Sequence, residues 1–156
     1  MKFLCDQMLA GLGRWLRIAG YDTLIIENSL EDREILKRAL NENRILLTRD
    51  RHFLTMNAPE KSMIFIEGNT LEECIQELNQ KLHLDWLYAP FSRCILCNFI
   101  LVEPNDQIVD EQVPNDVRST TDKFWYCPLC KKVYWQGSHT ARMLEQLQTW
   151  QRLLHE

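Results

Sequence analysis

The sequence predicts an α/β fold: a small, doubly wound and mainly parallel sheet over residues 1–88, followed over residues 89–156 by a cysteine-containing module with a C-terminal helix. Short apolar runs alternate along residues 1–82 with segments whose apolar residues recur at helical spacing. The expected strands are apolar throughout, which is typical of strands covered by helices on both faces. From Phe91 onwards, two Cys-x-x-Cys pairs and shorter strand-like pieces replace this pattern.

Composition limits the class of protein. The 156 residues suffice for one domain with a small attached module, and 46% apolar with 26% charged residues is typical of a soluble globular chain. The net charge of −4 gives no overall basic bias, so any contact with nucleic acid is expected to be local. No apolar run approaches the roughly 20 residues of a membrane span. Asp6, Arg14 and Arg17 interrupt the apolar N-terminus that a signal peptide would need, so we expect a cytoplasmic protein.

Four short apolar runs are the expected strands. They are KFLCD, DTLIIE, RILLT and SMIFIE, at residues 2–6, 22–27, 44–48 and 62–67. The third run stops abruptly and is followed by the charged or polar residues Arg49, Asp50, Arg51 and His52. Such a strand end is expected either where a strand opens into a functional site or at an ordinary solvated turn.

Three helices are expected between and after these strands, because apolar residues recur there every three or four positions. They are expected at residues 8–19, 29–41 and 70–82. Gly20 is the expected stop of the first helix. Ser29 is expected to begin the second, and Thr70 with Glu73 forms a capping box at the start of the third.

The C-terminal module has weaker signals. FILVE, FWYC and KVYWQ are strand-like, and a connection rich in Pro, Asn and Asp spans residues 104–122. Ser138 is expected to cap a final helix. The apolar stripe of that helix consists of Leu144, Leu147, Trp150 and Leu154.

The six cysteines fall into two groups. Cys5 and Cys74 stand alone in apolar surroundings and are expected to pack as small hydrophobic residues. Without an export signal, two Cys-x-x-Cys pairs favour a metal over disulfides, although redox-active or coincidental pairs remain the alternative. Four thiolates complete a tetrahedral zinc site with no open position, so we expect the zinc to be structural. Its ligands would be Cys94, Cys97, Cys127 and Cys130.

Three carboxylates form the candidate catalytic site. Asp6 follows the first strand, Asp32 begins the second helix and Asp50 follows the third strand. In a doubly wound sheet, ligands bind beyond the carboxyl ends of the strands, where these segments can meet. Converging carboxylates stay ionised only if a cation compensates them, and magnesium or manganese suits such an oxygen-rich site. Asp22 precedes its strand and therefore belongs to the opposite edge.

Each carboxylate also has a purely structural interpretation. Asp32 can be the acidic partner of Ser29 in a capping box, Asp6 can cap the first helix, and Asp50 can begin a solvated turn. The functional interpretation therefore depends on the joint placement of the three carboxylates.

Arginines accompany the acidic residues. Arg14 and Arg17 lie three apart on one helix face, while Arg49 and Arg51 flank Asp50. A metal held by carboxylates and bordered by arginines is typical of a phosphodiester site, because arginines hold the phosphate backbone. The alternative for Arg14 and Arg17 is a solvated helix face.

With these motifs assembled, the chain resembles the Mut-seven C-terminal ribonuclease family, a PIN-like nuclease domain with a zinc ribbon. The matching segments are FLCDQMLAGLGRWLRIAGYDT, the ED at residues 31–32, ILLTRDR, both Cys pairs and VYWQGSH at residues 133–139. The resemblance implies a PIN-like fold, magnesium- or manganese-dependent cleavage of RNA, and Asp6, Asp32 and Asp50 as the acidic site. It also implies that Arg14, Arg17 and Arg49 lie beside that site.

One position departs from the family pattern. Related proteins often carry another Asp two residues after the Asp of TRD, whereas this chain has His52. The fourth acidic ligand, and with it the number of metal ions bound, is therefore open; Glu31 and Asp22 are weak substitutes.

The first rival interpretation is a nucleic-acid-binding or regulatory module with a zinc ribbon and no catalysis. Its contacts would come from Lys131, Lys132, Tyr134, Trp135 and His139, with bases stacking on the aromatic rings. Under the ribonuclease interpretation, His139 is expected to face a cleft between the modules and to contact substrate, unless it is an ordinary half-exposed helix residue.

The second rival is an aspartyl-phosphate protein, because Asp6 and Asp50 at strand ends also fit that class. A phosphatase of this kind carries a second Asp where this chain has Met8, and a receiver domain needs a Lys after a later strand, which SMIFIEG lacks. Both features disfavour this class.

Overall fold

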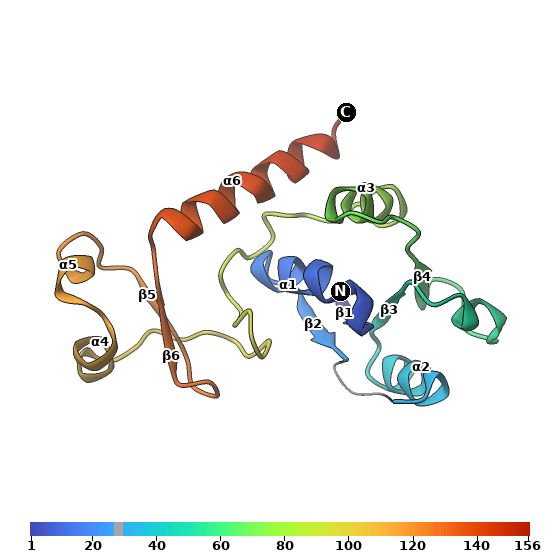
Figure 1. Ribbon diagram of the computed structural model, residues 1–156, viewed down its shortest axis with the longest axis horizontal. Coiled ribbons are helices and arrows are strands. Elements are labelled where there is room, and N and C mark those ends of the chain that lie inside the picture. The colour runs from blue at the N-terminus through green and yellow to red at the C-terminus, as the bar shows by residue number, and fades with distance from the viewer. Residues whose placement is uncertain (27–29) are drawn as a thin grey trace.

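The computed structural model describes residues 1–26 and 30–156. Its N-terminal part is a four-stranded sheet in the order β2-β1-β3-β4, and every neighbouring pair is parallel (Figure 1). The strands are β1 (Lys2–Cys5), β2 (Asp22–Ile25), β3 (Ile45–Thr48) and β4 (Met63–Phe65). The predicted parallel α/β sheet is therefore confirmed.

Helices cover both faces of this sheet. They are α1 (Ala10–Ile18), α2 (Asp32–Asn41) and α3 (Leu71–Lys81). Successive strand residues point to opposite faces. Accordingly, Phe3 and Cys5 belong to a core shared with α1 and α3, whereas Leu4 packs with α2 in a second core. The two cores explain why the strand runs are apolar at every position.

Some boundaries differ from the prediction. The first helix begins with a single 3₁₀ turn, η1 (Gln7–Leu9), which the Asp6 side chain caps, and α1 itself starts at Ala10. The capping box of Thr70 and Glu73 at the start of α3 is confirmed. The predicted helix start at Ser29 lies outside the described residues.

The C-terminal module contains an antiparallel hairpin, β5 (Phe124–Cys127) and β6 (Lys132–Trp135). The connection that looked irregular in the sequence contains two short helices, α4 (Asp106–Gln112) and α5 (Asn115–Arg118). Asn105 caps α4 by accepting a hydrogen bond from the Ile108 backbone N–H (2.9 Å). FILVE forms only isolated bridges rather than a continuous strand.

The last helix, α6 (Ser138–Leu153), extends from the hairpin to the sheet domain (Figure 1). Its N-cap is Gly137 rather than Ser138, and the Gly137 N–H donates to the Thr140 hydroxyl (2.8 Å). Leu147 and Trp150 of the predicted stripe are buried in the same core as α1 and α3. No helix among the described residues has both the length and the apolar character needed to cross a membrane.

Trp150 connects this helix to two other aromatic rings. The centre of its ring lies 4.8 Å from the ring centre of Trp15 and 5.2 Å from that of Trp86, and both pairs have edge-to-face geometry. The indole N–H of Trp86 donates to Asn79 of α3 (2.7 Å). The sheet domain and the C-terminal helix therefore share one hydrophobic core.

Candidate functional site

The three predicted carboxylates line one small cavity at the carboxyl edge of the sheet. Asp6 follows β1 and Asp50 follows β3, and these strands are neighbours on either side of the point where the strand order reverses. Asp32, the first residue of α2, completes the wall of a cavity of about 180 Å³. A reversal point of this kind is where doubly wound sheets bind ligands.

Asp6 is fixed by three hydrogen bonds. Its Oδ1 accepts from the Met8 N–H (2.9 Å), and its Oδ2 accepts from the Thr48 hydroxyl (2.6 Å) and the Arg49 N–H (3.0 Å). The capping role that the sequence left open is thus present. These bonds also hold the carboxylate across the β1–β3 boundary in one orientation.

Asp50 caps a second 3₁₀ segment, η2 (Arg51–Thr55), through an Oδ1 that accepts from the His52 N–H (2.9 Å). The Asp50 N–H donates to the Thr48 hydroxyl (3.0 Å). Thr48, which is fully buried, therefore connects Asp6 to Asp50. Thr48 was not among the predicted site residues, although its place at the end of an apolar run, two residues before Asp50, was the available signal.

Asp32 contacts the residue that departs from the family pattern. Its Oδ2 lies 2.6 Å from Nδ1 of His52, and the two side chains are 26% and 60% exposed. A helix N-terminus also favours a negative charge at this position. The two residues lie 20 positions apart in different elements, so no sequence pattern predicted their contact.

The carboxylates share a cavity but do not form a preassembled coordination sphere. Within residues 1–26 and 30–156, the group of metal-binding side chains whose ligand atoms all lie within 4.8 Å of one another is the four cysteines. The chemistry of the acidic donors nevertheless fits a hard divalent cation such as magnesium or manganese.

The predicted arginines occupy different environments. Arg14 is exposed on α1. Arg49 is half-buried and donates to the Asn69 side chain (3.0 Å) beyond β4. Arg17, only 6% exposed, donates to the backbone oxygens of Thr23 (2.8 Å) and Ile95 (2.8 Å). Its guanidinium therefore joins α1 to β2 and to the first cysteine loop.

The four paired cysteines meet in space. Sγ of Cys97 lies 3.4 Å from that of Cys127, and Sγ of Cys94 lies 3.9 Å from that of Cys130. A tetrahedron of thiolates with Zn–S bonds of about 2.3 Å has its sulfurs about 3.8 Å apart. The cluster therefore fits a metal ion such as zinc, as the spacing predicted.

The surroundings of this cluster favour metal binding. Burial by itself would raise the pKa of Cys94, but hydrogen bonds from the Tyr134 hydroxyl (3.2 Å) and from the backbone of Cys97 and Leu96 lower it to about 7. Burial and the neighbouring thiols raise the pKa of Cys97. Four thiols this close lose their protons together only when a cation compensates the charge.

Cys5 and Cys74 lie in the main core instead, as predicted. Burial is the largest cause of the raised pKa of each thiol. Both are therefore protonated packing residues rather than ligands or nucleophiles.

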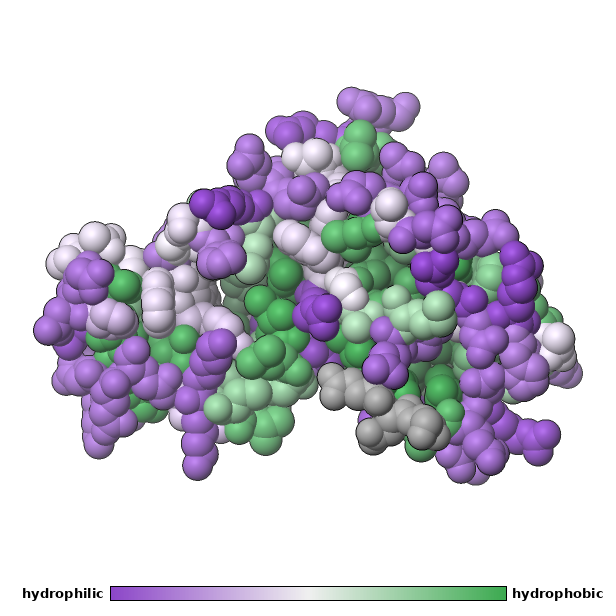
Figure 2. All heavy atoms as spheres, viewed as in Figure 1, coloured by the Kyte–Doolittle hydropathy of each residue, from purple (hydrophilic) through white to green (hydrophobic). Residues whose placement is uncertain are grey.

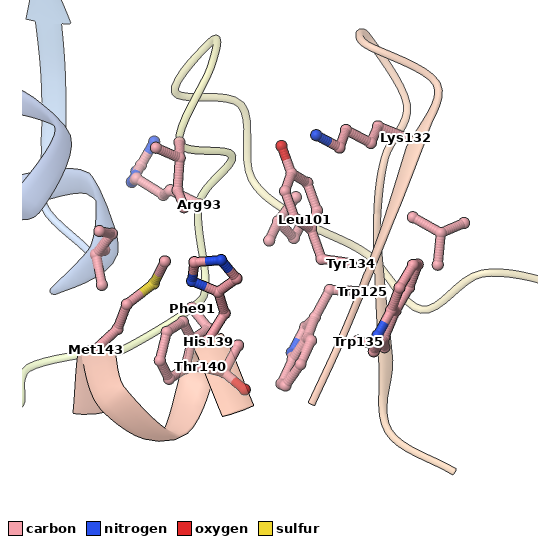
Figure 3. Close-up of a pocket in the computed structure, with 13 residues that line it drawn as sticks. Phe91, Arg93, Leu101, Trp125, Lys132, Tyr134, Trp135, His139, Thr140 and Met143 are labelled. Carbon is pink, nitrogen blue, oxygen red and sulfur yellow. The ribbon is translucent and has the colours of Figure 1, made fainter. Parts of the chain in front are cut away.

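A second, larger cavity of about 380 Å³ lies where the hairpin, the segment around Phe91 and the first turn of α6 meet (Figure 3). The surface is hollowed between the hairpin and the sheet domain, and apolar residues border the hollow (Figure 2). His139 lines this cavity. The residues that line this cavity lie between positions 91 and 143, except for Ile18 of the sheet domain, and the three carboxylates are not among them.

Comparison with known proteins identifies the family. Residues 1–147 match the family described as the Mut7-C RNAse domain, so nearly the whole chain is covered. Comparison with curated proteins and with solved structures gives no match. The parallel sheet, the cysteine cluster and this match agree on one conclusion: the chain belongs to the Mut7-C RNAse domain family.

Proposed function

We propose that the protein is a PIN-like, metal-dependent ribonuclease that hydrolyses RNA phosphodiester bonds in the cytoplasm. The observation that carries the proposal is the joint placement of Asp6, Asp32 and Asp50. They come from three separate segments and line one cavity at the carboxyl edge of the sheet. The family's description as an RNAse domain supports RNA as the substrate.

Asp6, Asp32 and Asp50 would hold magnesium or manganese. A bound divalent cation supplies charge neutralisation at the phosphate and lowers the pKa of a water. Carboxylates have about four lone-pair sites, so Asp6 and Asp50 can cap their 3₁₀ turns and still offer oxygen to a cation. The capping and ligand roles are therefore compatible, and the caps keep the two carboxylates in place.

Thr48 and His52 are proposed as positioning residues for this site. Thr48 bonds to the carboxylate of Asp6 and to the backbone of Asp50, so it fixes the spacing of the two segments. His52 lies against Asp32 and occupies the place where related proteins often carry another acid. It would orient Asp32 rather than add a fourth negative charge.

We propose that Arg14, Arg49 and His139 contact the RNA. Arg14 is exposed on α1, Arg49 lies directly before Asp50, and His139 lines the cavity beside the hairpin. Arg17, which the sequence grouped with them, supports this surface from within by fixing α1. Cleavage and the RNA contacts of Arg14 and Arg49 are assigned to residues 1–88, and the RNA contact of His139 and the structural zinc to residues 89–156.

The zinc would stabilise the C-terminal module rather than take part in cleavage. Cys94, Cys97, Cys127 and Cys130 offer four thiolates, which leave no open position for substrate or water. The hairpin and its short helices bury few large side chains, so metal binding would contribute much of the folding free energy of this module.

A cleavage assay tests the proposal. Purified full-length protein is incubated with labelled single-stranded and structured RNAs, with manganese, with magnesium or with neither. We expect cleavage that requires one of the two cations and is lost in Asp50→Asn. The competing class, a non-catalytic nucleic-acid-binding module, is favoured by the aromatic cavity at the hairpin. It predicts RNA binding with no cleavage under any of these conditions.

A further inference from the structure

The cavity beside the hairpin has an aromatic wall contributed by separate segments. Trp125 and Tyr134 are directly opposite each other in the β5–β6 register, so their side chains stand on the same face of the hairpin. Phe91 belongs to the segment that precedes the first cysteine pair, and its ring centre lies 6.0 Å from that of Trp125. Met143 of α6 closes the apolar side (Figure 3).

The polar groups of the cavity are cationic or neutral. Lys132 is exposed, and its Nζ lies 5.2 Å from the centre of the Tyr134 ring. His139 is exposed on the first turn of α6, where the helix N-terminus attracts negative charge. Among the described residues that line the cavity, none is Asp or Glu. In a chain with a net charge of −4, this surface therefore stands out as suited to an anion.

The third basic side chain of the cavity, Arg93, takes part in the fold. Arg93 donates to the backbone oxygens of Gly20 (3.3 Å) and Asn98 (3.0 Å), which fixes the cysteine loop against the sheet domain. Lys132 and His139 are therefore the two basic side chains left to contact an incoming anion. They lie on separate elements around the aromatic wall (Figure 3).

We propose that this cavity holds one unpaired nucleotide of an RNA strand, with its base against Trp125 and its phosphate beside Lys132 and His139. The proposal rests on the proposed function and names its substrate class as single-stranded RNA. Aromatic faces bind unstacked bases of any identity, and cationic groups follow the phosphates. A cavity of about 380 Å³ lies in the range that encloses a small molecule.

The occupied cavity would give the enzyme a second hold on its substrate, away from the acidic site. A base reaches an enclosed aromatic wall only if it is unpaired, so the cavity selects single strands, loops and ends over continuous duplex. Because the hairpin, the segment around Phe91 and α6 all contribute residues, the correct fold of the C-terminal module is itself required for this contact.

The test is equilibrium binding of a labelled single-stranded RNA of about 12 nucleotides to the full-length, zinc-loaded protein without magnesium or manganese. Trp125→Ala should weaken binding by about fivefold to 150-fold, the range for loss of one stacked base. Lys132→Ala should lower the salt dependence of log affinity by roughly 0.7, as expected for one lost phosphate contact on a single strand. Tyr134 is left intact because its hydroxyl contacts Cys94.

Two controls come from the same module. Phe99 is an exposed aromatic (47% exposed) that does not line the cavity, and Lys123 is an exposed lysine at the start of the hairpin. Phe99→Ala and Lys123→Ala should therefore leave affinity and salt dependence unchanged. Zinc content is measured for every variant, so that a loss of metal is separated from a loss of contact.

Parallel cleavage assays in manganese separate this inference from the proposed function. One outcome is that Trp125→Ala and Lys132→Ala bind RNA with full affinity while the unmodified protein shows manganese-dependent cleavage. This outcome contradicts the nucleotide site in the cavity but not the ribonuclease activity. The cavity would then serve another partner. Binding that is weakened by both variants, in a protein that cleaves no RNA, supports the cavity and overturns the ribonuclease.

Discussion

Removal of the Trp150 side chain should strongly destabilise the whole protein, because α6 is part of the sheet domain's core. Trp150 is only 2% exposed and packs edge-to-face against Trp15 and Trp86. An aromatic side chain buries roughly 200 Å², and at about 25 cal/mol/Å² that area contributes about 5 kcal/mol. The alanine side chain still buries part of this area, so we expect Trp150→Ala to lower the free energy of unfolding by about 4 kcal/mol, within the usual range for such a truncation.

The assay is urea unfolding monitored by far-ultraviolet circular dichroism, with zinc present throughout. A loss of about 4 kcal/mol in a chain of this size also lowers the melting temperature by roughly 8 to 16 °C. Leu153→Ala is the matched control, because Leu153 lies on the same helix and is 43% exposed. It should change stability by less than about 0.5 kcal/mol. A Trp150→Ala variant that loses less than about 1 kcal/mol would refute the shared core.

The remaining predictions concern zinc and acid stability. Cys127→Ser should reduce the zinc content of the purified protein to near zero. Hydrogen-exchange protection should then fall in β5 and β6, while β1 and β3 keep their protection. A variant that retains stoichiometric zinc would contradict the four-thiolate site. Burial would raise the pKa of Asp22, but hydrogen bonds from Arg44 and Asn98 outweigh it and hold the pKa below its usual value. The lowered pKa means that the carboxylate stabilises the fold above about pH 4 and loses that contribution as pH falls through the folded-state pKa. Asp22→Asn should therefore flatten the acid side of the stability curve, and an unchanged curve in urea titrations from pH 6 to 3 would exclude this role.

Much of the fold could be predicted because its signals are local and repeated. Continuous apolar runs separated by helical periodicity require a sheet covered on both faces, and that is the architecture observed. The cysteine cluster followed equally directly from two tight turns with two thiols each. The helices α4 and α5 were missed because they have only 7 and 4 residues and bury no side chain fully, so they carry no periodic signal.

The site was predicted less completely, because its contacts depend on the tertiary fold. Helical spacing placed Arg14 and Arg17 on one face. In the fold, Arg17 is buried and donates to the backbone oxygen of Ile95, 78 residues further along the chain, whereas Arg14 is exposed. The pairing of His52 with Asp32 likewise arises only when η2 meets the start of α2. Strand ends could be recognised in the sequence, whereas these side-chain partners could not.

The rate of RNA cleavage by Asp50→Asn in subsaturating manganese tests the central claim most directly. Asn keeps the side-chain oxygen that caps η2, so the fold should be retained, and RNA binding should persist. Loss of even an outer-shell partner of a metal site costs roughly 10-fold to 100-fold, so removal of a ligand charge should slow cleavage at least about a hundredfold. Asp122→Asn, an exposed carboxylate in the other module, is the control and should cleave normally. Cleavage by Asp50→Asn at the rate of the unmodified protein would contradict Asp50 as a ligand and remove the main support for a ribonuclease site at this edge of the sheet.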